Sequence, residues 1–429
     1  LRDFLDGNFI QESYVEATQD RIVRSLQTYF ASRRADSLAS HYQNLLLSTK
    51  QSEVDVSLAV VQSANLSSCK AQHKKIVENA DIEIDCLYSG NVSEKDAKAF
   101  FVEAGELLNK RGSKNPSVKL VGPDHRRLEL GKETEAHFAS QNPQEENGAV
   151  LMTYQSHIPG FRGADFSCPE SLQSTASLRL ISHMLREPLF DTLRTKQQLG
   201  YIVSSYYDLE FSHSDATATP IDLLSINVLS RKVSPPDVAT RIDDFLIGFR
   251  GSLMNMPESE IRDHADALSS KLLKPMQSLS SEASNHFSKI RRYAPEILRA
   301  GGNDSDLPWK SVEDLAGSIQ ALQRKDLVET WDRVVLGTDR SRVVSMVYGS
   351  TFPLDEKLAR KRATSSKSVV VNNAADLLKL RRNLKPYENK VERASQFAKL
   401  LPSSTYARLG FAAAAVGVIG FTLSARRKR

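Results

Sequence analysis

Cysteine is scarce in this chain, with three residues in 429. Cys69, Cys86 and Cys168 are odd in number, far apart in the sequence and without the spacing of a metal-binding cluster. This pattern argues against a disulfide-stabilised scaffold and against a cysteine-ligated metal site. Reduced, partly buried thiols in a cytosol-like compartment are the simpler interpretation.

Histidine motifs for zinc are also missing. None of the nine histidines begins or ends an H-x-x-E-H pattern, and none begins H-E-x-x-H. Both patterns place two imidazoles on one helix face with a glutamate that activates the metal-bound water. The nearest segment, residues 183–187, has the wrong spacing and no second histidine, so His183 is interpreted as an ordinary helix residue. The sequence therefore predicts no metal ligand and no catalytic residue in this chain.

Positive charge is lacking in the body of the chain, although the formal net charge is +5. Residues 351–408 carry 13 basic and 5 acidic residues, and residues 426–429 are all basic. Residues 1–350 consequently have a net charge of −7. A nucleic-acid-binding domain needs its basic patch on the fold itself, so no nucleic-acid partner is expected.

Hydrophobic periodicity predicts a first set of elements that is short of strands. Two helices are expected over residues 11–33 and 35–48, followed by a strand over 82–88. Ser93 and Asp96 have the spacing of a capping box and predict the start of a further helix. One strand is too few for a complete sheet, so these residues are expected to be part of a larger domain.

A second set of elements begins near residue 118. The predicted strands and helices are, in order, a strand over 149–158, a helix after Pro169, strands over 200–207 and 223–229, helices after Ser234 and over 261–272, short helices over 311–322 and 326–336, and a strand over 343–348. The helix after Ser234 has the clearest apolar stripe, formed by Val238, Ile242, Phe245, Leu246, Phe249 and Leu253. Residues 208–221 are polar and are predicted to form a loop.

The most informative segment is EPLFDTLRTKQQLGYIV, residues 187–203. A helix with charged residues is predicted to end near Gly200 and to lead into a strand. Arg194 and Tyr201 would then stand on either side of a helix-to-strand corner. A guanidinium and a phenol can both hydrogen-bond a peptide carbonyl, but neither can hydrolyse a peptide unaided.

This segment resembles a signature in the last domain of the insulysin, pitrilysin and nardilysin family, metallopeptidases with an inverted zinc motif. Residues 272–275 (LLKP), 279–283 (LSSEA) and 82–92 (IEIDCLYSGNV) resemble further family segments in the family order. The resemblance covers roughly residues 10 to 350. It implies that Arg194 and Tyr201 bind the peptide substrate, and that zinc is held by an N-terminal half that this chain does not contain.

Each of the two residues has a simpler structural alternative. Arg194 could form a salt bridge with a helix acid such as Glu187 or Asp191. Tyr201 could be a strand-edge aromatic packed on the core.

The resemblance implies an α+β fold with two homologous domains, each with helices packed on one face of a mixed, mainly antiparallel sheet. Residues 1–115 would complete the third family domain and residues 116–350 would form the fourth. A basic linker over 351–408, a transmembrane anchor over 409–425 and a basic tail over 426–429 are expected to follow.

The anchor prediction depends on 17 uncharged residues between Arg408 and the basic tail. At about 1.5 Å per residue they span about 25 Å, somewhat less than a hydrocarbon core of about 30 Å. The expectation is a single-pass membrane protein with its body in the cytosol, with a weak preference for the mitochondrial outer or the peroxisomal membrane.

Two functions remain open from the sequence. The first is the C-terminal half of a zinc metalloendopeptidase, inactive alone, which pairs with the N-terminal zinc-binding half and closes a chamber over short unfolded peptides. The second is a catalytically silent, membrane-tethered scaffold or assembly subunit. A homo-oligomer is a further compatible arrangement.

Overall fold

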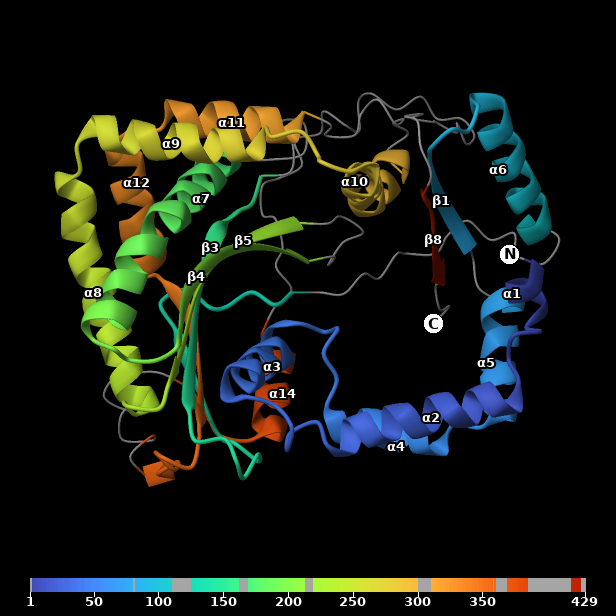
Figure 1. Ribbon diagram of the computed structural model, residues 1–429, viewed down its shortest axis with the longest axis horizontal. Helices are drawn as coiled ribbons and strands as arrows, with labels where there is room; N and C mark the ends of the chain where they lie inside the picture. Colours follow the sequence, from blue (N-terminus) through green and yellow to red (C-terminus); the bar gives the residue numbers. More distant parts are fainter. Residues whose placement is uncertain are drawn as a thin grey trace.

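The computed structural model describes most of the chain (Figure 1). The described residues are 2–79, 82–109, 125–161, 169–212, 219–299, 310–357, 359, 369–384 and 418–425.

A six-stranded mixed sheet forms the centre of the larger part of the molecule. Its strands, in spatial order, are β4 (Ile202–Ser212), β5 (Thr219–Ser230), β3 (Gly148–Pro159), β6 (Ser341–Tyr348), β2 (Glu133–Ala139) and β7 (Val369–Val371). The first three junctions between neighbours are antiparallel, and the two junctions of β2 are parallel. The four strands predicted in this part of the sequence are confirmed as β3, β4, β5 and β6.

One face of this sheet is covered by a two-layered group of helices (Figure 1). The helices are α7 (Pro169–Leu189), α8 (Pro235–Asn255), α9 (Glu258–Leu272), α11 (Ser311–Ala321) and α12 (Arg324–Trp331). Helix α8 begins where the sequence predicted, because the Ser234 side chain accepts a hydrogen bond from the backbone N–H of Asp237. All of its predicted stripe is buried except Phe245, which is partly buried against the same core.

The opposite face is covered by α3 (Ala35–Leu47) and α14 (Ala374–Asn383). The prediction of helices on one face thus describes only part of the arrangement. Neighbouring residues of β3 explain why: Val150 and Met152 face one core, whereas Ala149 and Leu151 face the other. A strand that is apolar on both sides must be covered on both sides. Strand β7 and α14 lie within the residues that the sequence assigned to a basic linker.

The first 109 residues contribute a separate group of elements that lies across from the sheet (Figure 1). They are α1 (Arg2–Asp6), α2 (Glu12–Gln27), α4 (Val54–Ser63), α5 (Leu66–Asn79), β1 (Ile82–Ser89) and α6 (Glu94–Asn109), with α10 (Leu279–Arg299) packed against β1. The predicted cap of α6 is confirmed, since the Asp96 N–H donates to the Ser93 hydroxyl at 3.1 Å.

The predicted membrane anchor over residues 409–425 is wrong. In the described part of the chain no helix is long and apolar enough to cross a membrane. Residues Val418–Ala425 form β8, which runs antiparallel to β1. This segment contains the β-branched residues Val418, Ile419 and Thr422, which favour a strand. The predicted single-pass membrane location depended on this anchor and is therefore wrong as well. Residues 409–417 and 426–429 lie outside the described residues.

The predicted loop over residues 208–221 is largely a β-hairpin. Strand β4 continues to Ser212 and β5 begins at Thr219, with Asp208 opposite Leu223 and Phe211 opposite Pro220. Asp222, just after the predicted loop, is fully buried and accepts hydrogen bonds from Thr175 and Tyr207. Residues 213–218 lie outside the described residues.

Candidate functional site at a helix-to-strand corner

The corner after α7 is built from a widened helical turn. Pro188 lies in the last turn of α7, and residues Phe190–Lys196 continue as a π-helix, η2. The N–H of Gln197 donates to the carbonyl of Thr192, five residues earlier, at 2.9 Å. Single π-turns of this kind occur frequently at functional sites.

Gly200 allows the chain to turn from η2 into β4. Its backbone lies so close to β5 that an added Cβ would be 1.7 Å from the carbonyl oxygen of Leu229. A side chain at this position is therefore excluded without movement of the backbone. Strand β4 begins two residues later, with Ile202 paired to Leu229.

The corner brings the two predicted residues together. The Arg194 guanidinium carbon lies 5.0 Å from the centre of the Tyr201 ring. It also lies 4.7 Å from the centre of the Phe190 ring, so the cation stands between two aromatic rings. Such cation–π contacts orient the guanidinium and leave its N–H groups at the edge of the plane as donors.

The structural alternatives for these residues are not observed. Asp191 forms an ion pair with Lys196 at 2.6 Å, and within the described ranges no carboxylate pairs with Arg194. Tyr201 is 82% exposed and is therefore not packed on the core. The corner thus presents an oriented cation and a phenol to solvent.

Phe190 was missed as a member of this site. It is 41% exposed and stacks on Arg194 from one helical turn earlier. The spacing of four residues between Phe190 and Arg194 was the available signal, because residues four apart share one helix face.

The histidines near the corner do not form a metal site. His183 on α7 makes an edge-to-face contact with His264 on α9, with ring centres 5.7 Å apart. Burial, together with the neighbouring His264, Arg186 and Lys271, lowers the pKa of His183. Over the described residues no three His, Cys, Asp or Glu side chains are grouped so that they could hold a metal ion.

Comparison with known proteins places this corner inside a matched region. The family profile described as PQQ synthase PqqF-like, C-terminal lobe domain 4, matches residues 180–287. The insulin-degrading enzyme of Homo sapiens is 24% identical over 281 residues, which are 66% of this chain and 25% of that protein. A nardilysin-like protein of Arabidopsis thaliana is 26% identical over 290 residues, or 66% of this chain and 24% of that protein.

The sequence is similar to those of the insulysin and pitrilysin peptidases, and the profile that matches it describes a domain of a C-terminal lobe. The crystal structure of pitrilysin has the same fold, with a TM-score of 0.61 and 16% identity over 87% of this chain and 35% of that one. The matched region spans about a quarter of the length of the curated relatives.

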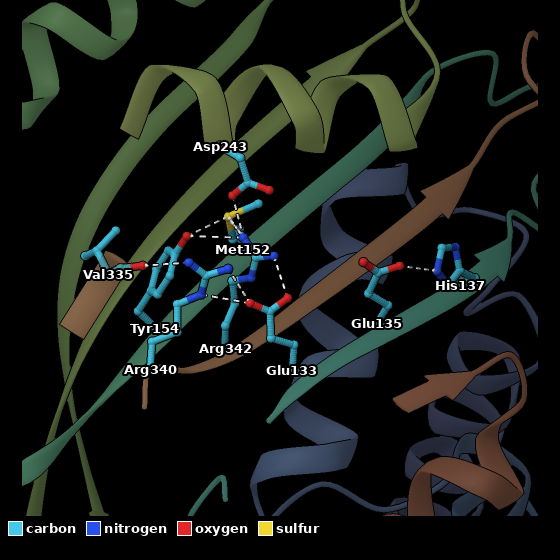
Figure 2. Close-up of polar contacts among 9 residues, drawn as sticks. All are labelled: Glu133, Glu135, His137, Met152, Tyr154, Asp243, Val335, Arg340 and Arg342. Carbon is cyan, nitrogen blue, oxygen red and sulfur yellow. Dashed lines mark hydrogen bonds and ion pairs between the residues drawn. The ribbon is translucent and has the colours of Figure 1, made fainter. Parts of the chain in front are cut away.

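A second polar cluster of this chain joins the central sheet to α8 (Figure 2). The Arg342 side chain, at the start of β6, is only 5% exposed. It donates to Glu133 on β2 at 2.7 Å and to Asp243 on α8, and lies 3.4 Å from the hydroxyl of Tyr154 on β3. Arg340 pairs with the other oxygen of Glu133. This cluster ties α8 to three strands.

The same face of β2 carries a buried pair beside this cluster (Figure 2). Nε2 of His137 lies 3.1 Å from the Glu135 carboxylate, and Nδ1 lies 2.8 Å from the Tyr348 hydroxyl. Both Glu135 and His137 are at most 1% exposed. The Arg342, Glu135 and His137 side chains are thus buried, in contrast to the exposed Tyr201 of the corner.

Proposed function

We propose that this chain is the substrate-binding, non-zinc half of an insulysin-like metalloendopeptidase, in which Arg194 and Tyr201 bind the backbone of the peptide. The observation that carries this proposal is the position of the Arg194 guanidinium. It is oriented by two aromatic rings, has no carboxylate partner in the described residues, and lies beside an exposed phenol.

The chemistry of the two side chains suits a peptide carbonyl. An arginine presents several N–H donors in a rigid plane, and a tyrosine hydroxyl can donate one more hydrogen bond. Donors placed where negative charge develops on the carbonyl oxygen stabilise the transition state more than the ground state. Loss of one such donor typically reduces turnover by about 10² to 10³-fold.

The proposal assigns different tasks to the two halves of the protein. The zinc and the residues that hold it would lie in the N-terminal half, which supplies the hydrolytic chemistry. The C-terminal half, represented by the present chain, would close the chamber over short unfolded peptides and hold the peptide backbone. On its own it would bind peptide without cutting it.

The test compares variants of the intact peptidase, which carries both halves. We expect Arg194→Ala and Tyr201→Phe each to lower kcat/KM for a fluorogenic peptide of about ten residues by 10²-fold or more. Lys196→Ala is the matched control, because it removes a positive charge from the same corner without touching either aromatic ring. We expect this control to stay within about twofold of the wild type.

Two results would contradict the proposal. Turnover by both variants equal to that of Lys196→Ala would show that the corner does not contact substrate. An intact protein that binds labelled peptide through Arg194 but does not hydrolyse it, with or without added zinc, would instead indicate a catalytically silent subunit.

A further inference from the structure

The corner is fastened to the rest of the fold through the peptide group of Leu199. The N–H of Leu199 donates to the carbonyl of Leu193 at 2.9 Å. The carbonyl of Leu199 accepts a hydrogen bond from the hydroxyl of Ser230. Arg194 follows Leu193 directly and Tyr201 is two residues after Leu199, so these two bonds fix the backbone next to both substrate-binding side chains.

Ser230 is itself fixed at the end of β5. It is 1% exposed, and its Oγ accepts hydrogen bonds from the N–H groups of Lys232 and Val233 at 3.2 and 3.1 Å. A hydroxyl that accepts two backbone donors and donates to one carbonyl has little rotational freedom. The turn that holds it leads directly into α8, whose N-cap is Ser234. Ser230 therefore attaches the backbone of the corner to the end of β5 in the central sheet.

The backbone at Gln198, directly before Leu199, is strained. Gln198 has φ of 53°, and it is the single non-glycine residue with positive φ in the described part of the chain. A left-handed conformation costs a non-glycine residue on the order of 1 kcal/mol or more, and persists only where the surroundings impose it. Lys232 helps to hold Gln198 in this conformation, because its Nζ donates to the Gln198 side-chain oxygen at 3.1 Å.

We infer that Ser230 is a positioning residue for the peptide-binding corner, acting through Leu199 on Arg194 and Tyr201. This inference rests on the proposed function of those two side chains. Without the Ser230 hydroxyl, the Leu199 carbonyl loses its partner and the strained turn at Gln198 relaxes. A displacement of about 1 Å in a group that stabilises a transition state can cost about 10²-fold in rate.

The experiment uses the intact peptidase with Ser230→Ala and, as its matched control, Ser234→Ala. The control removes a partly exposed hydroxyl four residues away that caps α8 and makes no bond to the corner. We expect Ser230→Ala to lower kcat between about 10-fold and 10²-fold with KM within about threefold. Ser234→Ala should leave kcat within about twofold.

A double-mutant cycle separates positioning from general destabilisation. In the Arg194→Ala/Tyr201→Phe background, Ser230→Ala should lower the residual kcat by less than about twofold, because the groups through which it acts are gone. An equal loss in both backgrounds, or a loss in the wild-type background no greater than that of Ser234→Ala, would overturn the inference.

The proposed function can fail separately. If Arg194→Ala and Tyr201→Phe have no effect on turnover, the substrate-binding role itself is wrong. If both have their expected effect and Ser230→Ala does not, only the positioning role is wrong.

Discussion

Two arginines of this chain show how surroundings decide what a guanidinium does. Arg342 is buried, with carboxylates from β2 and α8 as partners (Figure 2). Arg194 stands at a surface corner between two aromatic rings and has no carboxylate partner among the described residues. The first arginine donates from both terminal nitrogens to carboxylates of the protein and thereby holds parts of the fold together. The second keeps donors for a ligand.

The difference also predicts which arginine the fold needs. A buried charge that loses its partner leaves an uncompensated ion in a medium of low polarity, which is strongly destabilising. An arginine at the surface contributes little to folding because water replaces its contacts. Stability and peptide binding should therefore be separable at these two positions.

The largest effect is expected from Arg342→Met. It removes the buried cation that the partly buried Glu133 and Asp243 share, and Arg340 remains only for Glu133. We therefore expect a loss of about 3 to 5 kcal/mol in the free energy of unfolding. Urea unfolding measures this. Arg250→Met is the control, since Arg250 makes a similar two-pronged pair with Asp332 at the surface. Equal losses in the two variants would show that burial is not what separates Arg342 from a surface pair.

A buried acid extends the comparison to pH. Burial raises the pKa of the Asp222 carboxyl to about 6 from its ordinary 3.8, although Thr175, Tyr207 and Arg179 oppose the shift. Between about pH 4 and 6 the folded state therefore binds more protons than the unfolded state. The contribution of Asp222 to stability is complete below pH 4 and is lost as the pH rises through 6.

Asp222→Asn removes this dependence. We expect the difference in unfolding free energy between variant and wild type to shift by roughly 3 kcal/mol in favour of the variant from pH 4 to pH 7. Burial lowers the pKa values of His41, His125 and His157 to about 4, but these groups act equally in both proteins and cancel in the difference. A difference that stays constant with pH would mean that Asp222 titrates normally.

A medium effect is expected from Gly200→Ala at the corner. The added methyl group would overlap the Leu229 carbonyl, so the corner must move away from β5, at a cost of about 1 to 3 kcal/mol. Gly248→Ala is the control, because a Cβ there meets nothing within 4 Å and the helix gains a better helix former. A melting temperature for Gly200→Ala equal to that of Gly248→Ala would contradict the close approach of Gly200 to the Leu229 carbonyl.

The smallest effect on stability is expected from Arg194→Ala. Its two cation–π contacts are at the surface and are worth on the order of 1 kcal/mol together. The variant should therefore unfold within about 1 kcal/mol of the wild type even though its turnover falls by 10²-fold or more. A loss of stability as large as that of Arg342→Met would remove the contrast between the two arginines.

The sequence predicted local features well where one segment contains the whole signal. The apolar stripe of α8 with its Ser234 cap, the Ser93 capping box and the four central strands were found in this way. Arg194 and Tyr201 were predicted because they lie seven residues apart in one characteristic run. The family resemblance came from the same run and from further segments in family order.

Features that depend on distant residues were missed or wrong. The Arg342 cluster joins residues from β2, β3, β6 and α8, and Arg342 is 209 residues from Glu133. The segment 418–425 was predicted as half of a membrane helix from its apolar composition, but it pairs with β1. Residues 208–221 seemed too polar for strands, but residues 208–212 pair with residues 219–223 of β5, a pairing that the composition of the segment did not reveal.

The sequence by itself determined that Arg194 and Tyr201 lie at a helix-to-strand corner, because propensity, spacing and the Gly200 turn are local properties. Tertiary structure alone decided that Arg194 lacks a carboxylate partner in the described residues, and that Ser230 fastens the Leu199 carbonyl beside it. The physical reason is that a hydrogen bond or ion pair depends on distance in space. The folded sheet places Ser230, 31 residues along the chain, against the corner.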